Sequence, residues 1–472
     1  MKIILVSPPF GLEELVGETT SMKGVMNIIP PLGLAYIAAV VEQNNYDVEI
    51  IDCSLGMTHA ELEAELTIKS PDVIGFTATT PSLMSAIKAA QNVRRTLPNT
   101  ITVIGGSHVT ALPKETLEYT DAFDFGVIGE GEITFLELLR EIKKGDKMNL
   151  ENIAGLVYKK NGIVRITKPR AFIQDLDKIP HPARHLLPPL SEYHPTPAST
   201  RKLPQGVLMT SRGCPMKCTF CDRGVFGNRY RMRSAENVIS EIEDLIDKHG
   251  AKELKFFDDV FTLNKKRVYT IFDEMKQRGI DIGWSCLTSV KMINKEMLER
   301  MKKAGCWQVL YGLESGDQRM LDLLKKRVTV EQNAQAVRTA HSLGLRVRAD
   351  YILGTPGDSL ESMEATLQFA IRMNTDTAHF NKFTPYPGSE LYETLISQGY
   401  HWDFSEYHSQ LDHSVIMYIP ESISEEDYRK FLDTSYRRYY LRAGYIWKQL
   451  IGIRSIGDIH RLYLGYKAIK GL

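Results

Sequence analysis

Three cysteines fall within eight residues of the segment SRGCPMKCTFCD, residues 211–222. Cys214, Cys218 and Cys221 follow the spacing C-x3-C-x2-C, so one short loop supplies three thiolates. A structural zinc site normally takes four protein ligands, and no fourth Cys or His stands at finger spacing here. A [4Fe–4S] cluster held by three thiolates leaves one iron open for a small chelating ligand. The spacing favours such a cluster over two structural alternatives, buried cysteines and a zinc site completed by a distant residue.

The composition is that of a soluble globular protein, with 43% hydrophobic and 25% charged residues in 472 positions. This length predicts two or three domains. A formal net charge of zero gives no sign of a nucleic-acid partner. The six cysteines are spread too unevenly for a secreted disulfide framework. Neither a signal peptide nor an apolar run long enough to span a membrane is evident. We therefore expect a cytoplasmic, reduced protein.

Strand and helix patterns alternate twice along the chain, which predicts an α/β protein with two such domains. In residues 1–145 the apolar runs KIILVS, DVEIID, DVIGFTA, TITVIGG and DFGVIG alternate with helical patterns. This pattern indicates a parallel, doubly wound Rossmann-like sheet, whose ligand lies beyond the carboxyl ends of its strands. Residues 146–203 contain a predicted hairpin with Asn161-Gly162 at its turn, followed by a proline-rich linker.

A second alternation fills residues 204–398. Six strand patterns, GVLMTS, ELKFFDD, GWSCLTS, WQVLYGLES, RVRADYILG and AHFNKFTP, are each followed by a helical pattern. Six such units suit an open, TIM-type (β/α)6 barrel, in which chemistry collects at the carboxyl ends of the strands. The three cysteines come directly after the first of these strands. Residues 399–472 lose the alternation and become aromatic, basic and helical.

The cysteine motif, its aromatic Phe220 and its place after the first barrel strand resemble the radical S-adenosylmethionine (SAM) enzymes. In that family the open iron binds SAM, and one electron cleaves SAM to methionine and a 5′-deoxyadenosyl radical. The resemblance covers residues 206–398 and implies a [4Fe–4S] cluster on Cys214, Cys218 and Cys221. It also implies that Asp258 and Asp259, in KFFDDVFTLN, contact SAM or substrate. Glu314 and Ser315, in YGLESGD, would face SAM. Gly354, Pro356 and Gly357, in YILGTPGDS, would lie beside its adenine.

These secondary motifs also have structural interpretations, since acidic residues at strand ends often cap helices and Gly-Thr-Pro-Gly forms turns. The chain departs from the resemblance at Ser289, where related enzymes have an arginine, so one polar contact to SAM or substrate is in doubt. Cys286 and Cys306 are expected to pack in the core, with Cys286 pointing into the barrel as the alternative.

No G-x-G-x-x-G follows the first strand, which argues against NAD. Gly, Ser and Thr gather instead at later strand ends, and the segments PPLGLAYIAAVVE, GGSHVTALP and GEGE resemble the cobalamin-binding domain fused to one radical SAM subfamily. The resemblance covers residues 1–140 and implies these cobalamin-binding candidates: Thr77, Thr79, Gly105, Gly106, Ser107, His108, Gly129, Glu130 and Gly131. The D-x-H-x-x-G signature is missing, so His108 is not expected to ligate cobalt.

Residues 436–472 contain eight Lys or Arg and one acid, Asp458, with tyrosines and Trp447 between them. A solvated helical cap is the first interpretation. The alternative is a surface that docks peripherally on anionic lipid or covers a large apolar substrate.

Together these resemblances imply a cobalamin-dependent radical SAM C-methyltransferase, in which methylcobalamin delivers a methyl group to an unactivated carbon. An anaerobic oxidative cyclase of the magnesium-protoporphyrin type is the alternative, and a cobalamin carrier or sensor with a structural cluster is a third. A small-molecule substrate is expected, with a tetrapyrrole, a lipid or a terpenoid among the candidates. An external electron donor such as flavodoxin or ferredoxin is also expected.

Overall fold

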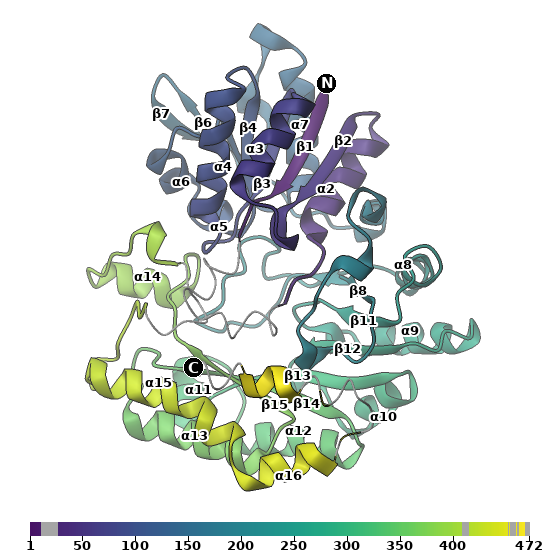
Figure 1. Cartoon of the computed structure of the whole chain (residues 1–472), viewed down its shortest axis with the longest axis vertical. Helices are drawn as coiled ribbons and strands as arrows, with labels where there is room; N and C mark the ends of the chain where they lie inside the picture. The colour runs from purple at the N-terminus through teal and green to yellow at the C-terminus, as the bar shows by residue number, and fades with distance from the viewer. Residues whose placement is uncertain (11–26, 408–414, 452, 454–458, 460–461, 468–472) are drawn as a thin grey trace.

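The structure is a computed structural model that describes residues 1–10, 27–407, 415–451, 453, 459 and 462–467. Two large sheets, both mostly or wholly parallel, lie one above the other in Figure 1, with helices around each of them. The predicted α/β fold with a Rossmann-like domain, a six-unit barrel and a helical C-terminal region is therefore confirmed.

The first sheet has the strand order β2-β1-β3-β4-β5-β6-β7, and its first five strands are parallel. Each of the five apolar runs in the sequence forms one of these strands. Their side chains are buried on both faces because helices cover the sheet on both sides. The elements are β1 (Lys2–Ser7), α2 (Leu32–Gln43), β2 (Asp47–Asp52), α3 (His59–Lys69), β3 (Val73–Thr77), α4 (Leu83–Thr96), β4 (Ile101–Gly105), α5 (Ser107–Ala111), α6 (Pro113–Tyr119), β5 (Phe125–Val127) and α7 (Gly131–Ile142).

The hairpin of β6 (Leu156–Lys160) and β7 (Ile163–Ile166) extends this sheet rather than standing in the linker. β6 pairs antiparallel with β5, with Gly126 opposite Val157. Asn161 and Gly162 both have positive φ, as a two-residue I′ turn requires. The predicted turn is thus present, but the hairpin belongs to the first sheet, which runs past the predicted boundary at residue 145.

The second sheet is the open barrel, with strand order β15-β14-β13-β12-β11-β8 and every pair parallel. Its two edge strands, β8 and β15, are not paired with each other, so the barrel stays open. The elements are β8 (Gln205–Leu208), α8 (Ala235–Asp247), β11 (Glu253–Phe256), α9 (Lys265–Gln277), β12 (Gly283–Thr288), α10 (Lys295–Lys303), β13 (Cys306–Glu314), α11 (Gln318–Leu323), α12 (Val330–Ser342), β14 (Arg346–Leu353), α13 (Leu360–Met373), β15 (Thr377–Lys382) and α14 (Glu390–Ser397).

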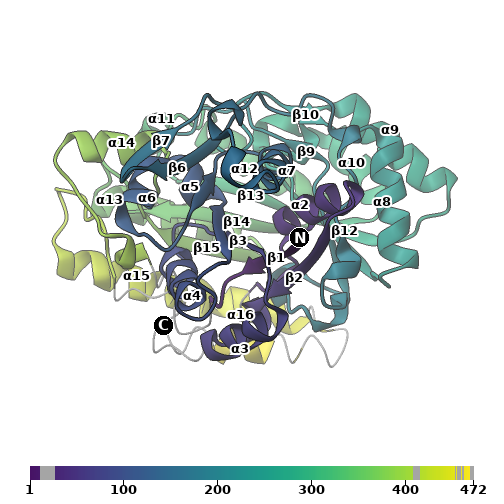
Figure 2. The same cartoon turned by 90° about the horizontal axis from the view of Figure 1, so that it is seen from above.

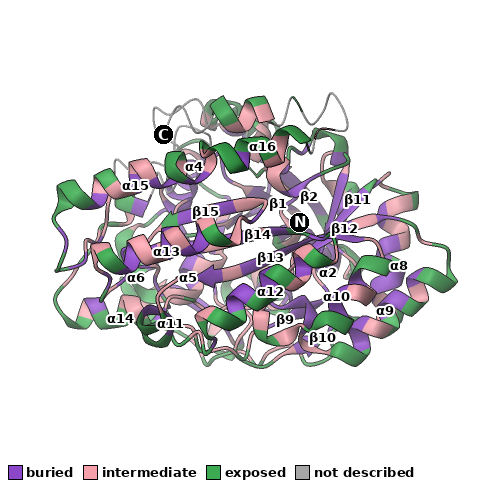
Figure 3. Cartoon of the chain, turned by 90° about the horizontal axis from the view of Figure 1, so that it is seen from below, coloured by how far each residue is buried: buried purple, intermediate pink, exposed green. Residues whose placement is uncertain are grey.

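The barrel core lies between the outer face of the strands and the surrounding helices. Figure 3 shows the strands mostly buried and the outer helix faces exposed. Cys286 and Cys306 are both in this core, as expected, so Cys286 packs outward and not into the barrel. The segment 197–205 closes the barrel at the amino ends of the strands, where Gln308 Nε2 donates to Ala198 O at 3.0 Å.

The tyrosines of the C-terminal region cover the open edge of the barrel. α15 (Glu425–Tyr440) and α16 (Ala443–Ile451) run beside β15, at the bottom of Figure 1. The Tyr440 hydroxyl donates to Ala378 O at 2.8 Å and accepts from Ala378 N at 2.9 Å, while Tyr436 accepts from Phe380 N at 3.1 Å. These hydroxyls replace the missing neighbour of an edge strand.

The basic residues of this region are mostly paired, which supports the cap interpretation for its described part. Arg438 pairs with Glu364, and Lys448 lies 3.2 Å from Asp376. The side chain of Trp447 is 66% exposed. Arg454, Asp458, Arg461 and Lys470 lie outside the described residues. In the part that the structure describes, no helix is long and apolar enough to cross a membrane.

A buried ion triad attaches the linker to the barrel. The fully buried carboxylate of Glu241 on α8 binds the guanidinium groups of Arg184, from the linker, and Arg233. Arg184 also donates to Val207 O on β8 at 2.8 Å. Burial alone would raise the pKa of Glu241, but the two arginines lower it to about 2. The triad therefore stabilises the fold in its ionised form.

This pKa predicts a pH-dependent effect of Glu241→Gln. At neutral pH we expect a loss of about 3–5 kcal/mol in the free energy of unfolding, because two buried arginines lose their carboxylate. The folded pKa lies below the ordinary value of 4.5, so the stabilisation is present above pH 4.5 and is lost as the pH falls toward 2. The difference between wild type and variant should therefore shrink by about 2 kcal/mol between pH 6 and pH 3.

Urea titrations at several pH values measure this difference. Glu243→Gln on the same helix is the matched control, because Glu243 pairs with Arg278 at the surface and should contribute less than about 1 kcal/mol. A wild-type advantage over Glu241→Gln that does not change with pH would contradict the ionised triad.

Candidate functional site

The three motif cysteines stand on a loop between β9 (Ser211–Arg212) and β10 (Arg231–Met232), a short antiparallel pair. Cys214 and Cys218 are half-buried and Cys221 is exposed. Gly213 has a φ of +87°, and a Cβ there would lie 2.3 Å from Arg229 O. Only glycine can therefore occupy this position, where the loop closes on itself. Among the described side chains, no three or more His, Cys, Asp or Glu are placed to hold a single metal ion.

Asp258 anchors the start of this loop rather than facing open space. Its buried carboxylate accepts from Thr210 Oγ1 at 2.7 Å, from Thr210 N at 3.2 Å and from the Ser211 hydroxyl. Arg267 completes the arrangement by donating to Thr210 O at 2.9 Å. Three of the acceptor sites of this carboxylate are thus used inside the protein, and a direct role of Asp258 toward SAM or substrate stays a prediction.

Asp259 is in a different environment from its neighbour. It is exposed, and the Gly213 backbone N–H bonds its carboxylate at the start of the cysteine loop. Although the residue is exposed, the protein around its carboxylate displaces part of the water, and this desolvation and the charge of Asp258 raise the pKa of Asp259. Of the two predicted aspartates, Asp259 is thus the one still available to a ligand.

Glu314 and Lys326 form an ion pair next to the cysteine loop. Lys326 Nζ lies 2.6 Å from Glu314 Oε1 and 5.8 Å from the centre of the Phe220 ring. Glu314 has a φ of +60°, at a register shift where β13 pairs with β14. A non-glycine residue in this left-handed conformation costs about 1 kcal/mol or more and is typical of functional sites. Sequence reasoning missed Lys326, because nothing in LDLLKKRV distinguishes it from a solvated lysine.

The remaining barrel candidates hold the fold around this site. The Ser315 hydroxyl lies 2.9 Å from Thr366 Oγ1 on α13. A Cβ on Gly354, which has a φ of +80°, would lie 2.1 Å from the Tyr428 hydroxyl. The backbone of Gly354 therefore makes room for helix α15. Its expected place beside adenine stays a prediction. Gly357 has a φ of +87° and its carbonyl accepts from Arg319, whereas Pro356 is half-buried in the same turn.

A cavity of about 200 Å³ lies between the first sheet and the cysteine loop. Six predicted cobalamin-binding residues line it: Thr77, Gly105, Gly106, Gly129, Glu130 and Gly131. Val225 and Phe226, just after the cysteines, form part of its wall together with Met209 and Arg212. The other walls are apolar and include Leu5 and Phe135. Apolar walls and exposed glycine backbone fit part of a large, flat ligand, as cobalamin requires.

Three predicted residues lie outside this lining. Thr79 bonds Ser82 through its backbone N–H, at 3.0 Å, and Ser107 begins helix α5. His108 is fully buried, with Nδ1 3.1 Å from Thr80 Oγ1 and its ring against Phe404. Burial lowers the pKa of His108 to about 4, so the ring is neutral at physiological pH. His108 packs between the first domain and the C-terminal region, away from the cavity.

Glu130 and Glu132 bind the two arginines that flank the cysteine loop. Glu130 lies 2.8 Å from both Arg212 NH1 and Arg231 NH1, and Glu132 lies 2.6 Å from Arg212 NH2. All four side chains are buried. We call this group the interdomain clamp. It attaches the amino end of α7 to β9 and β10, so the GEGE segment holds the cysteine loop against the first domain.

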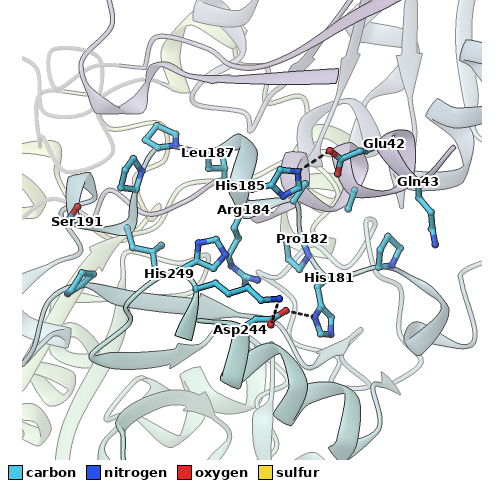
Figure 4. Close-up of a pocket in the computed structure, with 18 residues that line it drawn as sticks. Glu42, Gln43, His181, Pro182, Arg184, His185, Leu187, Ser191, Asp244 and His249 are labelled. Atoms are coloured by element: carbon cyan, nitrogen blue, oxygen red, sulfur yellow. Dashed lines mark hydrogen bonds and ion pairs between the residues drawn. The ribbon is translucent and has the colours of Figure 1, made fainter. Parts of the chain in front are cut away.

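A larger cavity, of about 790 Å³, lies elsewhere, between the linker, α2 and α8. Figure 4 shows two of its three histidines beside carboxylates: His185 Nε2 lies 2.9 Å from Glu42 Oε1, and His181 Nδ1 lies 3.5 Å from Asp244 Oδ2. None of the predicted site residues lines this crevice. Six of the predicted residues line the smaller cavity instead. The first sheet lies over the barrel sheet, so the two overlap when seen from above in Figure 2.

Comparison with known proteins agrees with this geometry. Residues 208–370 match the model of the radical SAM superfamily, and residues 22–139 match the B12 binding domain. The chain therefore belongs to the radical SAM superfamily and carries a B12-binding domain. The expected cofactors of this class, a [4Fe–4S] cluster, SAM and cobalamin, are confirmed, and so is the prediction that the chain is an enzyme.

Two relatives and one solved structure define its place more closely. The uncharacterized methyltransferase PH0819 of Pyrococcus horikoshii is 37% identical over 480 residues, with 100% of this chain and 98% of the relative covered. An anaerobic magnesium-protoporphyrin IX monomethyl ester cyclase of Rubrivivax gelatinosus is 29% identical, over 94% of this chain and 78% of the relative. The radical SAM methyltransferase TsrM of Kitasatospora setae, solved with cobalamin and a [4Fe–4S] cluster, shares the fold, with a TM-score of 0.72 at 17% identity and coverage of 100% and 99%.

The methyltransferase class predicted from the sequence is therefore confirmed. A cyclase, the class of the alternative prediction, is also among the relatives of this chain.

Proposed function

We propose that this enzyme transfers a methyl group to an unactivated carbon of a small-molecule substrate. The observation that carries the proposal is the shared wall between the two cofactor sites. Val225 and Phe226, four and five residues after Cys221, line the glycine-rich cavity of the first domain. One loop thus borders both the cluster thiols and the cobalamin cavity, so a single substrate carbon can be reached from both sides.

When bound, the cluster and SAM supply a radical that removes hydrogen from the substrate, and cobalamin carries the methyl group that replaces it. We assign the cluster to Cys214, Cys218 and Cys221. Lys326, which lies beside Phe220 and Glu314, would supply the cation for the carboxylate of SAM. Asp259 is the available acceptor for its amino group.

On the cobalamin side, the glycine backbone of Gly105, Gly106 and Gly129 provides the surface, and the apolar cavity takes one end of the ligand. We propose that His108 would not be a ligand of cobalt, because its ring is held by Thr80 and Phe404. A weakly ligated cobalt suits methyl transfer. Glu130 has its proposed role in the interdomain clamp and not at the cofactor.

Ring-forming oxidation is the second candidate, supported by the 29% identity to a cyclase. The two reactions leave different products. Methyl transfer consumes two SAM molecules, one leaving as S-adenosylhomocysteine and the other as methionine and 5′-deoxyadenosine, whereas oxidation leaves no S-adenosylhomocysteine. Both need electrons from outside the chain, and we propose a flavodoxin or ferredoxin as donor.

The test is an anaerobic product analysis. The enzyme is reconstituted with iron, sulfide and cobalamin, supplied with SAM and a strong reductant, and its nucleoside products are quantified by mass spectrometry. We expect 5′-deoxyadenosine together with S-adenosylhomocysteine that forms only when cobalamin is present. Deoxyadenosine without S-adenosylhomocysteine would support the cyclase, and neither product from a fully loaded enzyme would support a carrier.

A further inference from the structure

The interior of the barrel carries charged side chains that the proposed chemistry does not use. On β11, Leu254 and Phe256 pack outward in the barrel core, so Lys255 between them points inward. The same alternation turns Arg348 and Asp350 inward on β14 and His379 inward on β15. We call these four residues the lumen cluster. They lie on the face of the strands opposite to the one that packs in the barrel core.

Within the lumen cluster, Asp350 contacts both Arg348 and His379. Asp350 accepts from Arg348 through both carboxylate oxygens, at 3.0 Å from Nε and 3.3 Å from NH2, and its Oδ1 lies 3.6 Å from His379 Nδ1. Burial and the neighbouring Arg348 lower the pKa of His379 to about 4. His379 is therefore neutral at pH 7, and the Asp350 charge is offset by Arg348.

Lys255 has no such partner. The residue is 5% exposed, and among the described residues its ammonium has no hydrogen-bond acceptor or carboxylate within contact distance. Its Nζ lies 5.1 Å from the centre of the Phe257 ring. Burial and Arg348 lower the pKa of Lys255 to about 8, against the attraction of Asp350 and Glu253. Most of the lysine is therefore charged at pH 7.

The nearest other acid, Glu253, is occupied at the closed end of the barrel. Its carboxylate accepts from Arg201 N at 3.0 Å, from Lys202 N at 3.1 Å and from Gln205 Nε2 at 2.9 Å. Two further interior polar atoms, Ser285 Oγ and Gln308 Oε1, are buried without a partner among the described residues. Buried polar groups without partners are rare and indicate a missing ligand or water.

We propose that Lys255 binds an oxyanion, a carboxylate or a phosphate, carried by the substrate. Arg348, which pairs with Asp350 and bonds Ser199 Oγ at 3.4 Å, adds positive charge beside it. The inference rests on the proposed function, since it names the substrate class of that site. An oxyanion supplies the acceptors that the three Lys255 N–H groups lack, and its charge offsets the buried ammonium. The segment 197–205 closes the far end of the barrel, so the anionic end enters first and the rest of the substrate lies toward the cysteine loop.

Binding of small anions tests this assignment without turnover. The enzyme, reconstituted with cluster and cobalamin and saturated with SAM so that the SAM site is filled, is titrated by fluorine NMR. The ligands are 4-fluorobenzoate, 4-fluorophenyl phosphate and the neutral 4-fluorobenzamide. We expect at least one anion to bind and the amide not to bind, and the two anions distinguish a carboxylate from a phosphate site.

Two variants locate the site. Lys255→Met and Arg348→Met should each weaken anion binding about tenfold or more, because each removes a positive charge beside the anion. Lys252→Met is the matched control, since Lys252 precedes the same strand but is exposed, and it should bind as wild type does. Equal binding of amide and benzoate, no anion binding at all, or unchanged affinity in Lys255→Met would each overturn the proposal.

Thermal unfolding of the anion-free protein separates this role from a structural one. A buried ammonium without a partner destabilises the fold, so Lys255→Met should raise the melting temperature while it weakens anion binding. A lower melting temperature would mean that Lys255 supports the fold and would overturn the assignment. Neither measurement depends on methyl transfer, so a failure of the proposed reaction would be seen separately.

Discussion

Cys218→Ala is expected to abolish the formation of 5′-deoxyadenosine from SAM. The variant has two of the three cluster thiolates, and a [4Fe–4S] cluster with an open iron needs all three. Cys218 lies between the other two cysteines on a loop that is fixed at both ends by β9 and β10. We therefore expect the bound iron to fall well below about four per chain and nucleoside release to fall to background. Iron analysis and mass spectrometry measure the two effects.

The Cys218→Ala substitution should not change the binding of cobalamin. Its lining includes Val225 and Phe226 but none of the cysteines, so cobalamin absorbance should match that of wild type. Cys53→Ala is the matched control, because Cys53 is buried in the first domain and should leave cluster and activity in place. Full 5′-deoxyadenosine formation by Cys218→Ala would show that the cluster is held by other residues.

Glu130→Gln is expected to lower the free energy of unfolding by about 3–5 kcal/mol, because it removes one partner of a buried ion pair. Arg231 is 6% exposed and has no other carboxylate partner among the described residues. Its remaining bonds, to the carbonyls of Ile173 and Phe226, do not neutralise its charge. Arg231 begins β10, so the cysteine loop should lose its fixed end and cluster retention should fall as well.

The same variant separates two roles for Glu130. The sequence predicts a cobalamin contact, whereas the geometry predicts a clamp, and only the clamp makes the cofactor-free protein less stable. Urea unfolding without cofactors measures this, with Glu137→Gln as control, because Glu137 pairs with Arg170 near the surface and should cost less than about 1 kcal/mol. Unchanged stability with weakened cobalamin binding would restore the cofactor role.

Local patterns in the sequence were sufficient for the domains and for the cluster loop. The spacing of Cys214, Cys218 and Cys221 is a local property, because one loop provides all three thiols. The strands were equally predictable from the sequence, since buried parallel strands are continuous apolar runs. The turn at Asn161-Gly162 was predictable because few dipeptides adopt positive φ twice.

The uses of individual polar residues were not predictable in this way. Glu130 and Asp258 lie in segments expected to meet cofactors or substrate, yet their carboxylates bind Arg212 and Thr210. Gly354 makes room for Tyr428, which is 74 positions away in the chain. Nothing in the sequence around Lys326 indicated that this lysine lies beside the cysteine loop.

The sequence by itself determined the class of chemistry and the two α/β units, because thiol spacing and hydrophobic periodicity act over a few residues. Only the tertiary structure decided which side chains are still free to bind a ligand. The tyrosines of residues 436–445 could cover a substrate or an edge strand, and their contacts with β15 decide for the strand. The lumen cluster was equally hidden, since Lys255 is on β11, far in the chain from the strands β14 and β15 that carry Arg348 and His379. Their shared interior exists only because the six strands curve into a barrel.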